Sequence, residues 1–157
     1  MKLRFATAVS ALLIAASFAV AAERGEAKLT LAGKKIVIDY GRPALAGRDM
    51  LSRLPPGESW RLGADAETTL VTGADLMFGT VAVPKGRYVL TAKRAAADQW
   101  TLIASASDGK EIAVPLEQQK LPSSVELFTI ELTGKGTSGQ LLTKWQTLQL
   151  GAAFTAK

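Results

Sequence analysis

The sequence contains no cysteine and no histidine among its 157 residues. The lack of cysteine excludes disulfides, thiol nucleophiles and thiolate metal sites. The lack of histidine excludes an imidazole base, a Ser-His-Asp triad and histidine-bound zinc. The spaced acids of a calcium-binding loop are missing too. We therefore expect neither a metal nor a cofactor, and any catalysis would have to use carboxylates, lysines or hydroxyls.

Charge is missing from one long stretch at the N-terminus, residues 5–22, which two basic residues precede. The small residues at 19–21 fit a signal-peptidase site, so we expect residues 1–21 to be a signal peptide. Residues 22–157 are then expected to be a single domain, periplasmic or secreted, without a stable membrane anchor. The alternative is a membrane anchor, but the run is rich in alanine and is interrupted by two serines, so its transfer energy is weak.

The basic excess is small. Cleavage removes two of the 19 basic residues and none of the 14 acidic ones, so the net charge falls from +5 to 17 − 14 = +3. A nucleic-acid binder would show a stripe of Lys and Arg or a set of aromatic stacking platforms, and neither is present. We therefore expect no nucleic-acid partner.

Apolar and polar residues alternate in short runs that Gly, Pro and Asp-Gly positions separate, a pattern typical of half-buried strands. Helical periodicity is nearly absent. About eight to ten short strands without covering helices predict an all-β fold, an antiparallel β-sandwich that is jelly-roll-like. Asp108-Gly109 is expected to close a tight hairpin. The residues expected to face the core are Leu29, Leu31, Ile36, Ile38, Tyr40, Tyr88, Leu90, Ala92, Trp100, Leu102, Ala104, Phe128, Ile130 and Leu132.

Residues 41–58 break the alternation with three prolines and three glycines. Proline removes a backbone donor, and a loop of this length in a compact domain usually carries function or is mobile. We therefore predict one long irregular loop here, and a short helix from 47 to 54 is an alternative for part of it. The loop contains several arginines and leads directly into Trp60.

Several separated motifs carry a family resemblance. They are "YGRPALAGRDML", "SWRLGAD", "VAVPKGRYVL", "QWTLI" and "VELFTIEL", and they extend from about Leu29 to Leu150. In order and spacing they resemble a bacterial family known only as domain-of-unknown-function family 2911. The resemblance implies an exported, single-domain β protein and transfers no activity.

The chain departs from the family's usual motif at one place. Where members usually have Trp-Arg-x-Gly-Ala-Asn-Glu-Ala-Thr, this chain has Asp65 at the Asn position, Ala66 at the Glu position, and an acid one residue later, Glu67. A shift of one residue along a strand turns a side chain to the opposite face. A fixed carboxylate is therefore not carried over from the family.

The arginines near the long loop are the strongest site candidates, because a guanidinium is permanently charged and suits carboxylate, phosphate or sulfate. They could line a pocket for a small anionic or carbohydrate ligand. Alternatively, they could pair with Asp49, Asp65 and Glu67 and fasten the loop to the sheet, which we favour because a buried arginine needs a partner. The candidate residues are Arg42, Arg48, Trp60, Arg61, Asp65 and Glu67.

Two classes of function stay open. One is a non-catalytic binding or interaction module for a small anionic or carbohydrate ligand or for a protein partner. The other is a carboxylate-dependent hydrolase similar to a glycosidase, with Asp65 and Glu67 as its acid pair. Two acids at this spacing are common on solvated strands, so we assign no catalytic residue.

Overall fold

The computed structural model describes residues 20–157, and the first 19 residues of the predicted signal peptide lie outside them. Within the described part the chain forms strands and no helix, which confirms the all-β prediction. Consequently, none of the described residues forms a helix that is long and apolar enough to span a membrane. The strands are β1 (Glu23–Leu31), β2 (Lys34–Arg42), β3 (Ser59–Trp60), β4 (Thr68–Thr72), β5 (Leu76–Phe78), β6 (Val81–Val83), β7 (Gly86–Ala96), β8 (Gln99–Ala106), β9 (Glu111–Lys135) and β10 (Ser138–Ala156).

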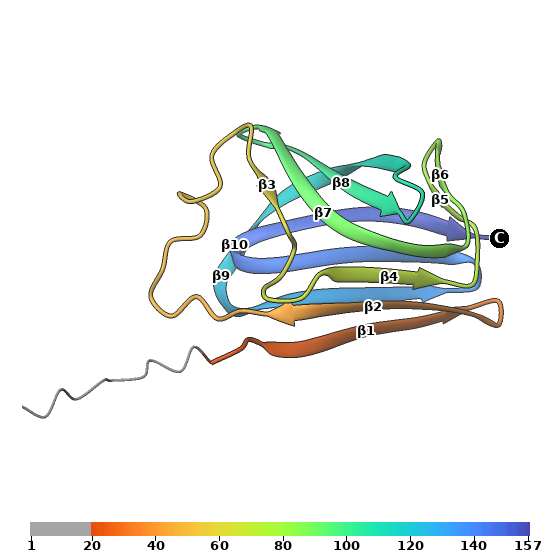
Figure 1. Cartoon of the computed structure of the whole chain (residues 1–157), viewed down its shortest axis with the longest axis horizontal. Helices are drawn as coiled ribbons and strands as arrows, with labels where there is room; N and C mark the ends of the chain where they lie inside the picture. Colours follow the sequence, from red (N-terminus) through yellow and green to blue (C-terminus); the bar gives the residue numbers. More distant parts are fainter. Residues whose placement is uncertain (1–19) are drawn as a thin grey trace, which may run out of the picture.

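All strands belong to one open antiparallel sheet in the order β1-β2-β4-β7-β8-β9-β10-β5-β6, and the short β3 pairs with β7. The sheet curls so that its early and late strands face each other around the core (Figure 1). Just beyond β2, the Pro43 carbonyl accepts a hydrogen bond from the amide of Phe128 in β9 at 3.0 Å. The sandwich-like fold is therefore built from one curled sheet and not from two separate ones.

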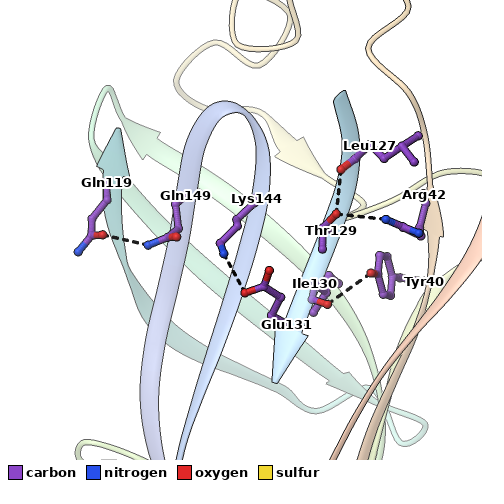
Figure 2. Close-up of polar contacts among 9 residues, drawn as sticks. All are labelled: Tyr40, Arg42, Gln119, Leu127, Thr129, Ile130, Glu131, Lys144 and Gln149. Carbon is purple, nitrogen blue, oxygen red and sulfur yellow. Dashed lines mark hydrogen bonds and ion pairs between the residues drawn. The ribbon is translucent and has the colours of Figure 1, made fainter. Parts of the chain in front are cut away.

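The last strand, β10, folds back on itself. Its 19 residues would span about 60 Å if fully extended, yet the amide of Ala156 donates to the carbonyl of Thr137 at 2.7 Å. Gln146 has a φ of 52° at the reversal, where the pairing with β9 also shifts register. Figure 2 shows this reversal as a hairpin with Lys144 on one leg and Gln149 on the other. Outward side chains of the two legs therefore lie side by side.

The alternation predicts the core faces well. Of the side chains expected to face inward, all are buried except Leu29 and Leu132, which are partly buried at the periphery. The Asp108-Gly109 hairpin is confirmed, because it joins β8 to β9, Gly109 has a φ of 84°, and Asp108 Oδ1 accepts the Lys110 amide at 2.9 Å. Strand periodicity is local information, which is why the sequence carries it.

Trp60 lies at the centre of an aromatic cluster. It is 7% exposed and stacks on Trp145 with ring centroids 5.7 Å apart and planes 17° apart. Its ring also meets Phe128 at 4.9 Å and Trp100 at 6.5 Å. Trp60, named above as a candidate site residue, is therefore part of the hydrophobic core. Because β3 has only two residues and directly follows the long loop, this packing fixes where the loop ends.

We expect Trp60→Ala to lower the free energy of unfolding by about 3–5 kcal/mol, because it removes a buried aromatic side chain and leaves a cavity. Denaturant unfolding followed by circular dichroism measures this change. Val71→Ala, at a 44% exposed position in β4, is the control and should shift stability little. Equal stability of Trp60→Ala and Val71→Ala would contradict the central role of the cluster.

Candidate functional site

The long irregular loop is confirmed, but it begins two residues later than predicted, because Gly41 and Arg42 still belong to β2. The alternative of a short helix over 47–54 is wrong. This stretch contains isolated turns, in which the amides of Arg53 and Leu54 each bond the carbonyl three residues earlier. Side chains from β9 and β10 take other loop amides, so the turns do not propagate into a helix.

Amide and carboxylate oxygens of the sheet hold the middle of the loop. Gln146 Oε1 accepts the amides of Met50 and Leu51 at 3.0 and 3.3 Å. The other end of the same side chain donates from Nε2 to Asp49 Oδ1 at 3.0 Å. A Glu126 carboxylate oxygen accepts a further loop amide at 2.9 Å. The loop is therefore fastened at the β10 reversal and at β9.

Arg94 of β7 holds the exit of the loop. Its Nη1 donates to the carbonyl of Leu54 at 2.6 Å, and its own carbonyl accepts the amide of Gly57 at 2.7 Å. The guanidinium carbon lies 5.4 Å from the ring centroid of Trp100, within the range of a cation–π contact. Sequence reasoning missed Arg94, Gln146 and Glu126, because their proximity to the loop depends on long-range pairing.

The predicted arginines Arg42 and Arg48 point to separate places. Arg42 is partly buried and donates to the Phe128 carbonyl at 3.4 Å. It also donates to Thr129 Oγ1 at 3.4 Å (Figure 2). Its Nη1 lies 3.6 Å from a carboxylate oxygen of Glu23. Arg48 instead bonds two carbonyls of its own loop at 2.9 and 2.7 Å. These two residues do not line a common site.

Arg61, Asp65 and Glu67 do come together, in the turn between β3 and β4. Together with Thr68 and the outer surface of β7 they line a pocket of about 250 Å³, which we call the charged pocket. All three side chains are exposed. Arg61 Nη1 donates to the backbone carbonyl of Asp65 at 3.1 Å and not to its carboxylate.

The N-terminal strand packs against this turn. Arg24 forms an ion pair with Asp39 and reaches the carbonyl of Ala66 at 3.4 Å. The amide of Ala22 donates to Asp65 Oδ2 at 2.6 Å. On the neighbouring β2, Gly41 is required, because a Cβ there would collide with the backbone of the turn at Ala64.

The arginine–carboxylate network that we favoured from the sequence does not form. Among residues 20–157, no ion pair joins the three predicted arginines to Asp49, Asp65 or Glu67. Backbone carbonyls satisfy Arg48 and Arg61, and Arg42 turns toward β9. The loop is fastened, but by Gln146, Glu126 and Arg94.

Asp65 and Glu67 are both exposed, whereas a general acid needs a carboxyl in a protected environment. No group of three or more acids among these residues could hold a metal ion.

A second depression lies on the outer face of β9 and β10, beside the turn between β5 and β6. Its volume is about 450 Å³, which falls in the range of about 300–1,000 Å³ usual for ligand pockets, whereas the charged pocket is smaller than that range. We call it the amide groove. It is lined by Phe78, Gly79, Thr80, Val81, Pro115, Glu117, Gln119, Gln140, Leu142, Gln149, Gly151, Ala152 and Ala153.

The fold-back of β10 builds this groove. Gln149 pairs with Gln119 across β10 and β9, and its Nε2 donates to Gln119 Oε1 at 2.9 Å (Figure 2). Gly151 keeps the floor open, because a Cβ there would lie 2.8 Å from the side chain of Leu142. Five of the six glutamines fall in residues 118–149. That concentration is the one signal in the sequence, but it does not reveal which glutamines share a face.

Comparison with models of protein families gives a match over most of the chain. A family model described as a protein of unknown function, DUF2911, matches residues 22–154. The chain belongs to this family. No curated protein and no solved structure matches it. The resemblance read from the sequence is thus confirmed, and the match starts at the first residue after the predicted signal peptide.

The protonation state of Asp49 affects how firmly the loop is held. The hydrogen bond from the Gln146 side chain, followed by that from the Ser52 amide, lowers the pKa of the Asp49 carboxyl. A carboxyl with a lowered folded-state pKa stabilises the fold above its ordinary pKa, and this contribution is lost as the pH falls through the lowered value. Protonation of Asp49 should therefore loosen the loop in acid.

We expect Gln146→Ala to free the middle of the loop, because it removes the acceptor of the Met50 and Leu51 amides and the donor to Asp49. Hydrogen exchange at neutral pH should become at least about fivefold faster at these two amides, since each loses about 1 kcal/mol or more of protection. Gln99→Ala, an exposed glutamine on β8, is the control. Unchanged exchange at Met50 and Leu51 would contradict the fastening role of Gln146.

We expect Arg61→Ala to leave the fold intact and to change the free energy of unfolding by no more than about 0.5 kcal/mol, because the side chain is exposed and makes one hydrogen bond to a carbonyl. Thermal and denaturant unfolding measure this. Unfolding of Arg61→Ala would restore the interpretation of Arg61 as a fastener.

Proposed function

We propose that this chain is an exported, non-catalytic binding protein whose amide groove holds a neutral carbohydrate. The observation that carries the proposal is the lining of the groove, which offers three glutamine side chains and a single charged residue, Glu117, in a volume of about 450 Å³. Amides both donate and accept hydrogen bonds, as sugar hydroxyls do.

The apolar lining complements the amides. Val81 and Leu142 contribute aliphatic surface, and Phe78 also lines the depression. Binding sites of this size usually combine apolar walls with a few placed polar groups. Sugar rings present both C–H faces and hydroxyl edges, so a saccharide matches both parts of this lining.

Charge favours a neutral ligand over an anion. No lysine or arginine lines the amide groove, and the Lys144 ammonium nearby on β10 is paired with Glu131 at 2.8 Å (Figure 2). An anion would meet Glu117 without a cation to offset it. The charged pocket offers Arg61, but it is smaller and contains two acids of its own.

Export is part of the proposal. The basic start, uncharged run and small residues at 19–21 support a cleaved signal peptide. Cleavage before Ala22 would leave the whole segment that matches the family model. The periplasm or the cell exterior is where such a protein would meet cell-surface or environmental glycans.

The test is a titration of the isotopically labelled protein with neutral oligosaccharides: glucans, xylans and chitin fragments. We expect the side-chain amide signals of Gln119, Gln140 and Gln149 to shift. Gln149→Ala should weaken binding about tenfold, because a buried hydrogen-bonding partner of the ligand is lost.

Two controls separate this proposal from its alternatives. Gln99→Ala removes an exposed amide outside the groove, and Arg61→Ala alters the charged pocket; neither should change the affinity. Binding of a sulfated or carboxylated sugar that depends on Arg61 and ignores Gln149 would move the site to the charged pocket. Turnover of a glycan that Asp65→Asn abolishes would favour the hydrolase instead.

A further inference from the structure

The start of the described chain forms a hydrogen bond to a carboxylate. The nitrogen of Ala22 lies 2.6 Å from Asp65 Oδ2, a short distance for a bond from a backbone nitrogen. In the uncut chain this nitrogen is an amide. Cleavage of the bond between Ala21 and Ala22 would convert it into an α-ammonium group at the same place.

The surroundings fit a cut at this bond. β1 begins at Glu23, and Ala22 is already half-buried against the turn. The two preceding described residues make no such packing, since Ala21 is exposed and Val20 is 93% exposed. The packed part of the chain therefore starts at Ala22, the first residue after the predicted cleavage site.

The carboxylate of Asp65 is free to receive a cation. It forms no ion pair with any side chain of residues 20–157. The nearby cations are engaged elsewhere: Arg24 with Asp39 and the carbonyls of Ala66 and Glu67, and Arg61 with the Asp65 carbonyl. Among residues 20–157, Glu67, the other acid of the turn, forms no hydrogen bond with Ala22.

We infer that the turn of residues 61–67 is a receptor site for the α-ammonium group of the processed chain, with the Asp65 carboxylate as its acceptor. This inference rests on the proposed export. Cleavage replaces a neutral donor with a charged one that carries three protons, which strengthens the existing hydrogen bond without moving the backbone. This contact holds the new N-terminus on the turn that packs against Gly41. It thereby stabilises the pairing of the edge strand β1 with β2.

The test uses the full-length chain, expressed in a bacterium with its own N-terminal segment and purified from the periplasm. Intact-mass measurement and N-terminal sequencing should find Ala22 as the first residue. The pKa of the α-amino group is then measured from the methyl carbon signal of Ala22 during a pH titration. We expect it to lie above the ordinary range of about 7.7–8.0 for such a group, because the ammonium form is paired.

Asp65→Asn and Glu67→Gln form a matched pair, since each removes one negative charge from the same exposed turn. We expect Asp65→Asn to lower the pKa of the α-amino group by about 0.5 or more, and Glu67→Gln to change it much less, because only Asp65 contacts the nitrogen. Hydrogen exchange at the start of β1 should also quicken in Asp65→Asn alone.

Each outcome decides between the claims. Equal effects of the two substitutions, or an α-amino pKa within the ordinary range, would overturn the receptor while leaving export intact. A first residue other than Ala22 would likewise overturn the receptor and preserve export. A chain that stays uncut in the cytoplasm would remove both the proposed export and this inference.

Discussion

The rest of the molecule depends on the packing of Trp60 against Trp145 and Phe128. β3 contributes only two residues to the sheet, and two residues of pairing with β7 cannot by themselves hold the end of a long loop. The buried ring supplies the missing stabilisation and connects β3 to β9 and β10. Because Trp60 is fixed, the turn that follows must leave the sheet at Arg61 and return at Thr68. The charged pocket and the contact with the N-terminal strand both follow from that constraint.

The sequence predicts what is local and misses what is long-range. Ile36 and Ile38, or Trp100 and Leu102, alternate with more exposed neighbours, and this period is sufficient to identify strands and core faces. The amide groove depends on the reversal at Gln146, a positive-φ residue without a signal such as the Asp108-Gly109 pair that marks the turn between β8 and β9. The reversal decides that Gln149 faces Gln119. Because Gln119 and Gln149 are 30 residues apart, local alternation does not reveal that they meet.

The misjudged role of the arginines has a physical cause. Backbone carbonyls in irregular segments have no strand partner, and a buried or half-buried carbonyl still needs a donor. A guanidinium offers five donors, so Arg48 serves the carbonyls of Ala44 and Leu45, and Arg94 serves that of Leu54. Carboxylates that are near in sequence are weaker competitors for these guanidinium donors, because an ion pair between exposed charges stabilises the fold little. Proximity of Arg and Asp in a loop therefore predicts an ion pair less well than the number of unpaired carbonyls does.

The two candidate surfaces differ in rigidity. The charged side chains of the charged pocket come from a turn in which Leu62 and Asp65 have positive φ, whereas the glutamines of the amide groove lie on the paired strands β9 and β10. Side chains on strands are positioned before a ligand arrives, so less ordering entropy is lost on binding. Gln119 and Gln149 already hydrogen-bond each other, which fixes both amides and leaves their remaining donors and acceptors directed by that bond. A weakly binding class of ligand such as neutral sugars needs this preorganisation more than an anion does, because no ionic attraction offsets the entropy of ordering.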